Sequence, residues 1–219
     1  MTEPTRAQRR KTRTRGALIA AAQGFLAEGT TDVSIQEITD RADVGFGSFY
    51  NHFSSKEELW AAAIDQTLAA HGALVASLTA AVDDPAETFC IGVRLTGRLH
   101  RFLPEVGRVL VHTGIAELLR DQGLADYALE DLRACIDAGR FDIVNPELAL
   151  AVAAGALLGV LHHLAARPEA DVDAVADETA LRLLIAFGLR RAEAGRIVGR
   201  PLPEPAAGGL EASAGRRAG

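Results

Sequence analysis

Residues 34–56 read SIQEITDRADVGFGSFYNHFSSK, and this stretch decides how the chain is organised. Ser34 and Glu37 form an S-x-x-E capping box, in which each side chain satisfies the backbone N–H of the other residue, so a helix is predicted to begin here. Residues 42–45 suit a tight turn, and a further helix of about two turns is predicted over 45–52. The pattern therefore predicts two short helices joined by a tight turn.

This pair of helices has the form of a DNA-binding helix-turn-helix. The second helix would enter the major groove, which is about 12 Å wide, while the first braces it across the backbone. The free N–H groups at the first helix start, and the side chains of Ser48, Tyr50 and Lys56, can contact phosphates. Phe46 either touches a thymine methyl group or packs partly against the core, because it lies three residues before Phe49. The predicted DNA-binding residues are Arg13, Ser34, Gly45, Phe46, Gly47, Ser48, Tyr50, His52 and Lys56.

Two features beside this stretch have two interpretations each. Residues 1–12 are polar and basic and are predicted to be disordered, so they are either a solubilising tail or an arm that reaches DNA phosphates or the minor groove. His52 is either a base-reading residue or an ordinary surface histidine. Between the arm and the motif, residues 14–28 have the apolar periodicity of an amphipathic helix, and Gly29 is a helix stop.

The remainder of the chain is predicted to be helical. Ala and Leu dominate its composition and favour helices, and no window shows the alternation typical of a strand. Overlapping capping boxes at Ser54 and Ser55 begin a long helix that ends before Asp83. Prolines and glycines then divide the chain into further helices. These helices are predicted over 85–102, 104–121, 124–137, 146–166 and 172–194, and a disordered tail over 200–219.

The segment 148–166 carries no formal charge and has two interpretations. Its length suits a membrane span, but it is Ala-rich, contains two histidines and has no flanking aromatic belt, so we favour a helix buried in a soluble protein. Small residues recur every four positions along it, and such a ridge lets two helices approach closely. We therefore expect a dimer interface built from this helix and the last one. The predicted interface residues are Ala151, Gly155, Gly159, His162, Thr179, Leu183 and Ala186.

The composition narrows the function classes. The net charge of −6 would argue against nucleic acid, but basic residues cluster in the first fifteen positions beside a single acid, Glu3. Cys90 and Cys135 are the only cysteines, and no secretion signal is recognised, so we expect buried thiols in the cytoplasm, with a redox switch as the alternative. No nucleophile elbow, phosphate-binding glycine loop, HExxH motif or paired carboxylate cluster indicates an enzyme.

These motifs as a set resemble the TetR-type transcriptional repressors. The resemblance covers about 45 residues of the N-terminal region. It rests on 17–25 with Gly29, on Ser34-x-x-Glu37-Ile38, on Ala42-x-Val44, on Gly47-Ser48-Phe49-Tyr50-x-His52-Phe53, and on Lys56-Glu57-x-Leu59. Gly45 and Phe46 depart from the pattern, since a serine and a polar residue such as lysine are commoner at these two positions.

The resemblance implies an all-α homodimer in which a three-helix DNA-binding domain precedes a domain of about six helices. It also implies a palindromic operator and an effector pocket enclosed by helices four to seven. We therefore divide the chain into an arm (1–12), a helix-turn-helix domain (13–56), an effector and dimer domain (57–199) and a tail (200–219). The expected pocket residues are Trp60, Phe89, Cys90, Leu99, His100, Phe102, His112, Ile115, Tyr127 and Phe141.

The sequence thus predicts a ligand-responsive repressor that binds double-stranded operator DNA and is released by a small, lipophilic effector. We expect no cofactor and no membrane association. We also expect no metal, because the cysteines and histidines match no close ligand spacing. The alternatives are an activator or a regulator without ligand response, and more remotely a membrane-associated helical protein.

Overall fold

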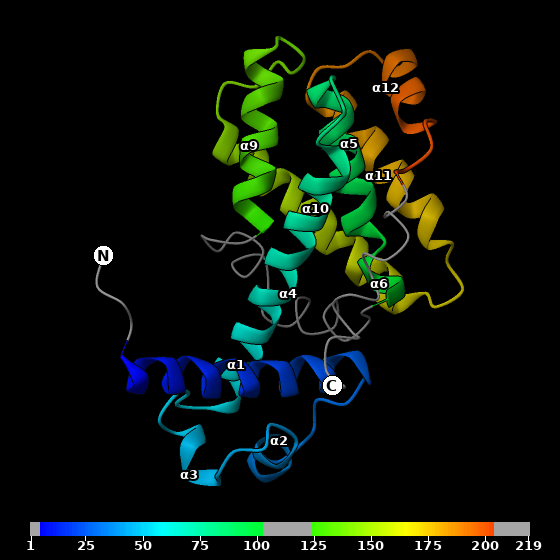
Figure 1. The fold of residues 1–219 in the computed structure, drawn as a ribbon. Coiled ribbons are helices and arrows are strands. Elements are labelled where there is room, and N and C mark those ends of the chain that lie inside the picture. Colours follow the sequence, from blue (N-terminus) through cyan, green and yellow to red (C-terminus); the bar gives the residue numbers. More distant parts are fainter. Residues whose placement is uncertain (1–4, 103–123, 204–219) are drawn as a thin grey trace.

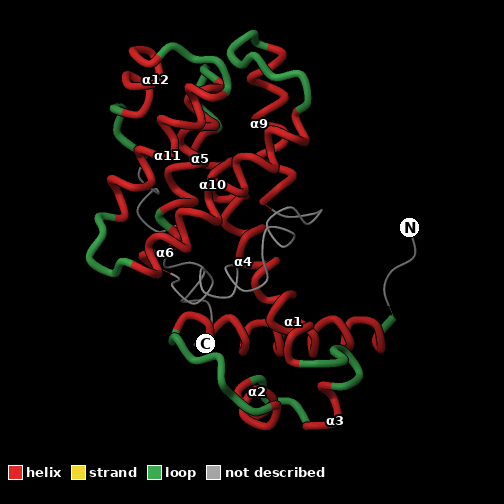
Figure 2. Tube along the Cα trace, turned by 180° about the vertical axis from the view of Figure 1, so that it is seen from behind, coloured by secondary structure: helices red, strands yellow, loops and turns green. Residues whose placement is uncertain are grey.

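The structure is a computed structural model that describes residues 5–102 and 124–203. Helices make up all the regular structure in these ranges (Figure 2). They form a small N-terminal unit and a larger helical bundle, and one long helix, α4 (Lys56–Thr79), runs from the first into the second (Figure 1). The all-α prediction is therefore confirmed.

The N-terminal unit consists of α1 (Arg6–Ala27), α2 (Ile35–Arg41) and α3 (Phe46–Phe49), closed by the first turns of α4. Figure 1 shows α1 lying across the base of the bundle, with α2 and α3 beneath it. Phe49 and Phe53 are almost completely buried and meet Leu18 and Ile38 in one apolar core. These buried rings fix the position of α3 against the facing helices, because truncating a buried aromatic side chain lowers the free energy of unfolding by about 3–5 kcal/mol.

The predicted disordered arm is wrong for residues 6–12, which form the first turns of α1. Thr5 caps this helix, because its hydroxyl accepts from the N–H of Gln8 while the Gln8 side chain accepts from the Thr5 N–H at 2.7 Å. Arg, Lys, Gln and Ala are good helix formers, so a capped run of them extends the helix rather than fraying. Residues 1–4 lie outside the described residues.

The bundle contains α5 (Pro85–Gly97), α6 (Leu99–Phe102), α9 (Leu124–Asp137), α10 (Pro146–Ala166), α11 (Val172–Ala186) and α12 (Arg191–Val198), with the upper half of α4. A second core fills its upper part, where the rings of Phe89, Phe141 and Phe187 lie 5.3–5.7 Å apart. α5 and α11 lie close together at Gly97, where an added Cβ would be only 3.0 Å from the Ala176 side chain. The absence of a side chain at Gly97 therefore permits this close packing.

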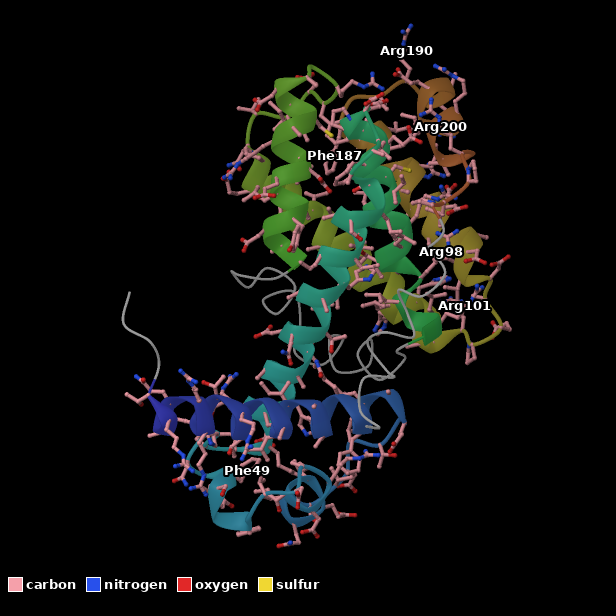
Figure 3. The ribbon with its side chains drawn as sticks, viewed as in Figure 1. Phe49, Arg98, Arg101, Phe187, Arg190 and Arg200 are labelled. Atoms are coloured by element: carbon pink, nitrogen blue, oxygen red, sulfur yellow. The ribbon has the colours of Figure 1, made fainter. Side chains whose placement is uncertain are left out.

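Two predicted helices are each divided in two. The helix predicted over 85–102 breaks at Arg98, whose guanidinium then forms 2.7 Å ion pairs with Asp173 and Asp177 of α11 (Figure 3). The last predicted helix ends at Ala186, because Gly188 takes a φ of +113°, which other residues rarely adopt. The predicted helix over 104–121 lies outside the described residues, as do residues 204–219 of the predicted tail.

α10 is only partly covered by the described part of the chain. Within the described ranges it is the one helix long and apolar enough to cross a membrane by length and composition, and 33% of its most apolar window is buried. Leu148 and Val152 are 62% and 48% exposed. The helix that we expected to be buried therefore presents an apolar face without a covering element among the described residues.

Candidate nucleic-acid interface and effector pocket

The two short helices of the N-terminal unit meet at a strained turn. α2 begins at Ser34, whose hydroxyl accepts from the Glu37 N–H at 3.2 Å while the Glu37 carboxylate accepts from the Ser34 N–H at 2.8 Å. At the other end of α2, Asp43 adopts a φ of +52°, and its N–H is bonded to the carbonyl of Asp40 at 3.1 Å. Asp tolerates this left-handed conformation better than most residues, which allows the tight turn into α3.

The outer face of α3 is aromatic. Phe46 is 47% exposed and Tyr50 is 56% exposed, and their rings pack edge to face with centroids 5.9 Å apart. Phe49, on the opposite face, is fully buried. Phe46 is therefore not part of the apolar core, and its contact with a thymine methyl group stays a prediction. The bare backbone at Gly45 and Gly47 lies on the same exposed surface.

A basic cleft runs between the first half of α1 and the end of α3. Ser48, Asn51 and the half-buried His52 form its α3 side. The Nδ1 atom of His52 is buried without a hydrogen-bond partner, and burial, followed by the charges of Lys11 and Arg15, lowers the pKa of this imidazole. The positive charge of the cleft suits an anion such as a DNA phosphate. Its α1 side consists of Arg6, Ala7, Arg9, Arg10, Lys11, Arg13 and Thr14.

Two predicted phosphate contacts are already engaged inside the protein. The Ser34 hydroxyl donates to the Glu37 carboxylate at 2.7 Å, and the Lys56 ammonium donates to the carbonyl of Val33 at 2.8 Å. Lys56 thereby ties the start of α4 to the loop before α2. An ammonium has three donors, so two stay available to a phosphate.

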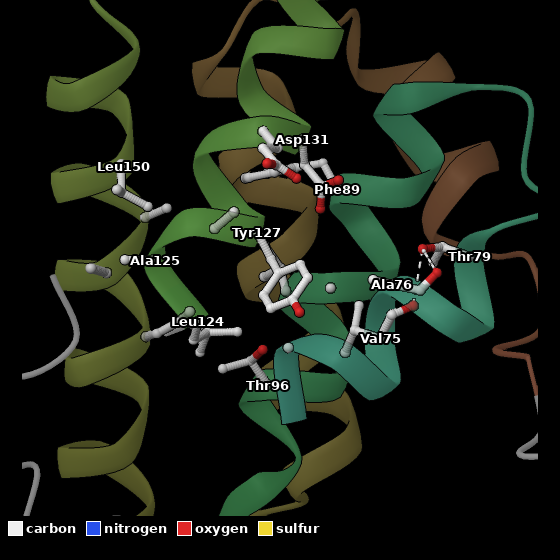
Figure 4. Close-up of a pocket in the computed structure, with 18 residues that line it drawn as sticks. Val75, Ala76, Thr79, Phe89, Thr96, Leu124, Ala125, Tyr127, Asp131 and Leu150 are labelled. Atoms are coloured by element: carbon white, nitrogen blue, oxygen red, sulfur yellow. Dashed lines mark hydrogen bonds between the residues drawn. The ribbon is translucent and has the colours of Figure 1, made fainter. Parts of the chain in front are cut away.

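A cavity of about 210 Å³ lies in the bundle between α4, α5, α9 and α10 (Figure 4). Tyr127 of α9 reaches across it toward α4, where Gly72 leaves room for the ring, since a Cβ there would lie 2.6 Å from Tyr127 Cδ2. Most of the lining is apolar. The described lining residues of α4 and α5 are Gly72, Val75, Ala76, Thr79, Phe89, Gly92, Val93 and Thr96, and those of α9 and α10 are Leu124, Ala125, Tyr127, Ala128, Glu130, Asp131, Leu150, Ala153, Ala154 and Leu157.

Phe89 and Tyr127 are the two expected pocket residues that line this cavity. Four others are placed elsewhere, because a helix turns by about 100° per residue and neighbouring apolar side chains point to different cores. Cys90 and Phe141 belong to the upper core of the bundle, whereas Trp60 and Leu99 pack against the core of the N-terminal unit. The remaining expected residues lie outside the described residues, namely the side chains of His100 and Phe102, and the whole of His112 and Ile115.

The polar groups of the cavity were missed in the sequence. The Asp131 carboxyl is half-buried, and burial, followed by the charge of Glu130, raises its pKa to about 6. Behind the wall, His71 Nε2 lies 3.2 Å from the Thr96 hydroxyl, and burial lowers the pKa of His71 to about 4. Asp131 and His71 are polar residues within helices, and such residues are usually expected to face solvent. Only the packing of α9 against α4 and α5 shows that they lie at the cavity.

The surroundings of the two cysteine thiols keep their reactivity low. Cys90 and Cys135 are free and buried, and burial raises the pKa of each to about 12. A protonated buried thiol is a poor nucleophile and metal ligand. No group of three His, Cys, Asp or Glu side chains capable of holding a metal occurs in the parts of the chain that the structure describes.

Four of the seven predicted dimer residues border a shallow groove between α10 and α11. Gly159, Thr179, Leu183 and Ala186 line it. Leu183 is 4% exposed and belongs mainly to the core of its own chain, so its share in an interface is small. The others are exposed or half-buried on α10, namely Ala151, Gly155 and His162.

These features define a class: a helix-turn-helix regulator whose DNA-binding unit is joined by one helix to a cavity-bearing bundle. The profile for bacterial regulatory proteins of the tetR family matches residues 17–63, and that for the tetracyclin repressor-like C-terminal domain matches residues 84–200. The second match spans more than half of the chain. The chain therefore belongs to the TetR family of transcriptional regulators, which are DNA-binding proteins and generally not enzymes.

Solved structures agree. RolR in complex with resorcinol is 30% identical, with a TM-score of 0.79 over 90% of this chain and 98% of RolR. The SmeT repressor of a multidrug efflux pump in Stenotrophomonas maltophilia is 21% identical, with a TM-score of 0.61 over 88% and 96%. The fatty acid degradation regulator FadR from Bacillus halodurans is 18% identical, with a TM-score of 0.62 over 86% and 100%, and like SmeT it supports the fold alone. No curated protein matches the chain.

Proposed function

We propose that this regulator is a cytoplasmic homodimeric repressor that binds a palindromic operator and is released by a small effector in the bundle cavity. The observation that carries the proposal is the course of α4. Its first half supplies Leu59 and Ile64 to the core of the DNA-binding unit, and its second half supplies Val75 and Thr79 to the cavity wall. An occupant of the cavity therefore acts on the same rigid helix that holds α1 and α3 in place.

The linkage has a simple thermodynamic form. A ligand shifts the equilibrium between a DNA-binding and a released state only by its difference in affinity for the two states. In this proposal the effector favours a state in which α4 is displaced, and the displacement changes the distance between the two α3 helices of the dimer. Half-sites about one helical turn apart, roughly 34–36 Å, would then no longer be matched.

The DNA-facing surface consists of α3 and the basic cleft. Phe46 and Tyr50 are the exposed side chains that would enter the major groove, and the α1 arginines would contact phosphates on the flanking backbone. Few hydrogen-bonding side chains stand on α3, so most of the affinity would come from phosphates and would fall steeply with salt. In the proposed division, the arm (1–12) and the DNA-binding domain (13–56) together form the basic cleft, and the effector and dimer domain (57–199) takes no part in it.

The effector class follows from the size of the cavity and from a relative that is 30% identical to this chain. RolR was crystallised with resorcinol, and the cavity of about 210 Å³ has room for a molecule of that size. We therefore propose a small aromatic effector rather than a long acyl chain.

The test is DNA retardation with fragments of the promoter upstream of the gene, with and without resorcinol. We expect a retarded complex at low salt, and an Arg13→Ala variant with its log K against log salt slope lowered by about one. Arg190→Ala is the matched control, because Arg190 lies at the far end of the bundle (Figure 3). Absence of any complex at low salt would exclude the repressor function.

A further inference from the structure

The Asp131 carboxylate is an unsatisfied group in the wall of the cavity. It comes from α9 and faces α5 across Gly92, where a Cβ would lie 3.9 Å from Asp131 Oδ2 (Figure 4). Among the described residues it has no hydrogen-bond or ion-pair partner. At neutral pH the carboxylate is ionised, since its raised pKa is about 6. A partly desolvated charge without a hydrogen-bond partner costs free energy. A ligand that donates a hydrogen bond to Asp131 would remove this cost and so gain affinity.

Two hydroxyl groups of the wall are already engaged. The Thr79 hydroxyl donates to the carbonyl of Val75 at 2.9 Å, and the Thr96 hydroxyl is paired with His71 at 3.2 Å. His71 is neutral, because burial holds its pKa at about 4. The Tyr127 hydroxyl completes the inventory of side-chain hydroxyls on the described wall. Of the two carboxylates in the described lining, Glu130 is exposed and Asp131 is half-buried, so Asp131 is the more desolvated acceptor that faces a ligand.

The charge of the described part of the wall disfavours anions. The described lining residues include two acids, Glu130 and Asp131, and neither lysine nor arginine. An effector with a carboxylate or phosphate would meet like charge in a medium of reduced dielectric constant. The size is also restrictive, because a dry cavity of about 150 Å³ holds a benzene ring, so about 210 Å³ holds one ring with one or two small substituents.

We propose that Asp131 anchors the effector, and that the effector is a one-ring molecule, neutral or cationic, which donates an O–H or N–H hydrogen bond to the Asp131 carboxylate. The proposal rests on the effector cavity of the proposed function and names the chemistry that the cavity accepts. It excludes organic acids and acyl-coenzyme A esters, whatever their apolar parts. Apolar contact with Phe89, Tyr127 and Leu157 would hold the ring itself.

The test is calorimetric titration of the full-length protein at pH 7.5 with four one-ring probes of similar size: phenol, benzylamine, benzoate and toluene. We expect phenol or benzylamine to bind at least tenfold more tightly than benzoate and toluene. Asp131→Leu removes both charge and acceptor, and should weaken that binding at least tenfold. Asp131→Asn keeps an acceptor, and should weaken benzylamine more than phenol. Asp137→Asn, an exposed acid at the end of α9 that is absent from the cavity lining, should change either affinity by less than about twofold.

A second variant covers the case in which Asp131 substitutions fold poorly. Gly92→Ala adds a methyl group at ordinary contact distance from Val75 and Asp131, so it narrows the site without a clash and should weaken phenol and benzylamine alike. Benzoate that binds as well as phenol, undiminished affinity in Asp131→Leu, or no binding of any probe at millimolar concentration would each overturn the proposal. Retardation of promoter DNA by the same preparations reports separately on the regulator function.

Discussion

At the scale of single residues, the contact between Gly72 and Tyr127 joins the cavity to α4. A Cβ on Gly72 would lie only 2.6 Å from Cδ2 of the Tyr127 ring, so Gly72→Ala must displace either the ring or the helix. We expect a loss of about 1–3 kcal/mol in the free energy of unfolding, measured by urea denaturation. Gly16→Ala is the matched control in α1, where a Cβ meets open space, and it should stabilise the protein slightly. Equal effects of the two substitutions would contradict the contact.

Asp131 gives a prediction for pH. Its carboxyl has a pKa of about 6 in the folded protein and about 3.9 when unfolded, so the folded state holds the proton more tightly. The resulting stability is present below about pH 4 and is lost as the pH rises through 6. Asp131→Asn should therefore raise the free energy of unfolding by about 1 kcal/mol or more at pH 7.5 and change it little at pH 4. An equal effect at both pH values would show that burial of the charge is not the cause.

Side-chain destinations were the least predictable part of the candidate site. Phe89 and Tyr127 could be assigned to a cavity from their type and helix, but Cys90 and Phe141 have the same apolar character and fill the upper core. An apolar helical position indicates burial, and whether it borders a core or a cavity depends on the facing helix. Asp131 could not be predicted for the same reason, since an acid on a helix is usually solvated.

At the scale of elements, α3 presents two faces with opposite requirements. Phe46→Ala truncates an exposed ring, so we expect the free energy of unfolding to change by less than about 0.5 kcal/mol while affinity for operator DNA falls. Phe49→Ala is the contrasting variant, because it empties a core position and should cost about 3–5 kcal/mol. Thermal unfolding and fluorescence anisotropy separate the two effects. A Phe46→Ala protein that is destabilised but binds DNA normally would place its ring in the core instead.

Caps and breakers made most elements predictable. The Ser34 and Ser55 caps and the proline at 146 begin helices where the sequence predicts. The start of α1 was missed because Thr5 and Gln8 form their capping box within a basic run that also suits a disordered tail. The break at Arg98 follows Gly97, which the prediction did not treat as a helix stop, and it accompanies tertiary ion pairs with Asp173 and Asp177, which no local pattern encodes.

At the scale of the whole molecule, we propose that two copies of the chain meet at the exposed apolar face of α10. Gly159 lies in the groove between α10 and α11, and a Cβ there meets nothing within 4 Å in the single chain. Gly159→Leu should therefore leave the fold intact but hold two facing helices apart, which gives a monomer in sedimentation equilibrium and loss of operator affinity. Gly195→Leu is the control on α12, where a Cβ also meets open space. A dimeric Gly159→Leu protein would move the interface elsewhere.

The most direct test of the link between cavity and DNA is an anisotropy titration of labelled promoter DNA, bound by the full-length protein, with a one-ring phenol such as resorcinol. The proposed α4 linkage predicts that DNA is released as the effector saturates the cavity, and that Asp131→Leu binds the same DNA but needs at least tenfold more effector for release. Effector binding that saturates the cavity while the anisotropy of the DNA complex stays constant would contradict the linkage.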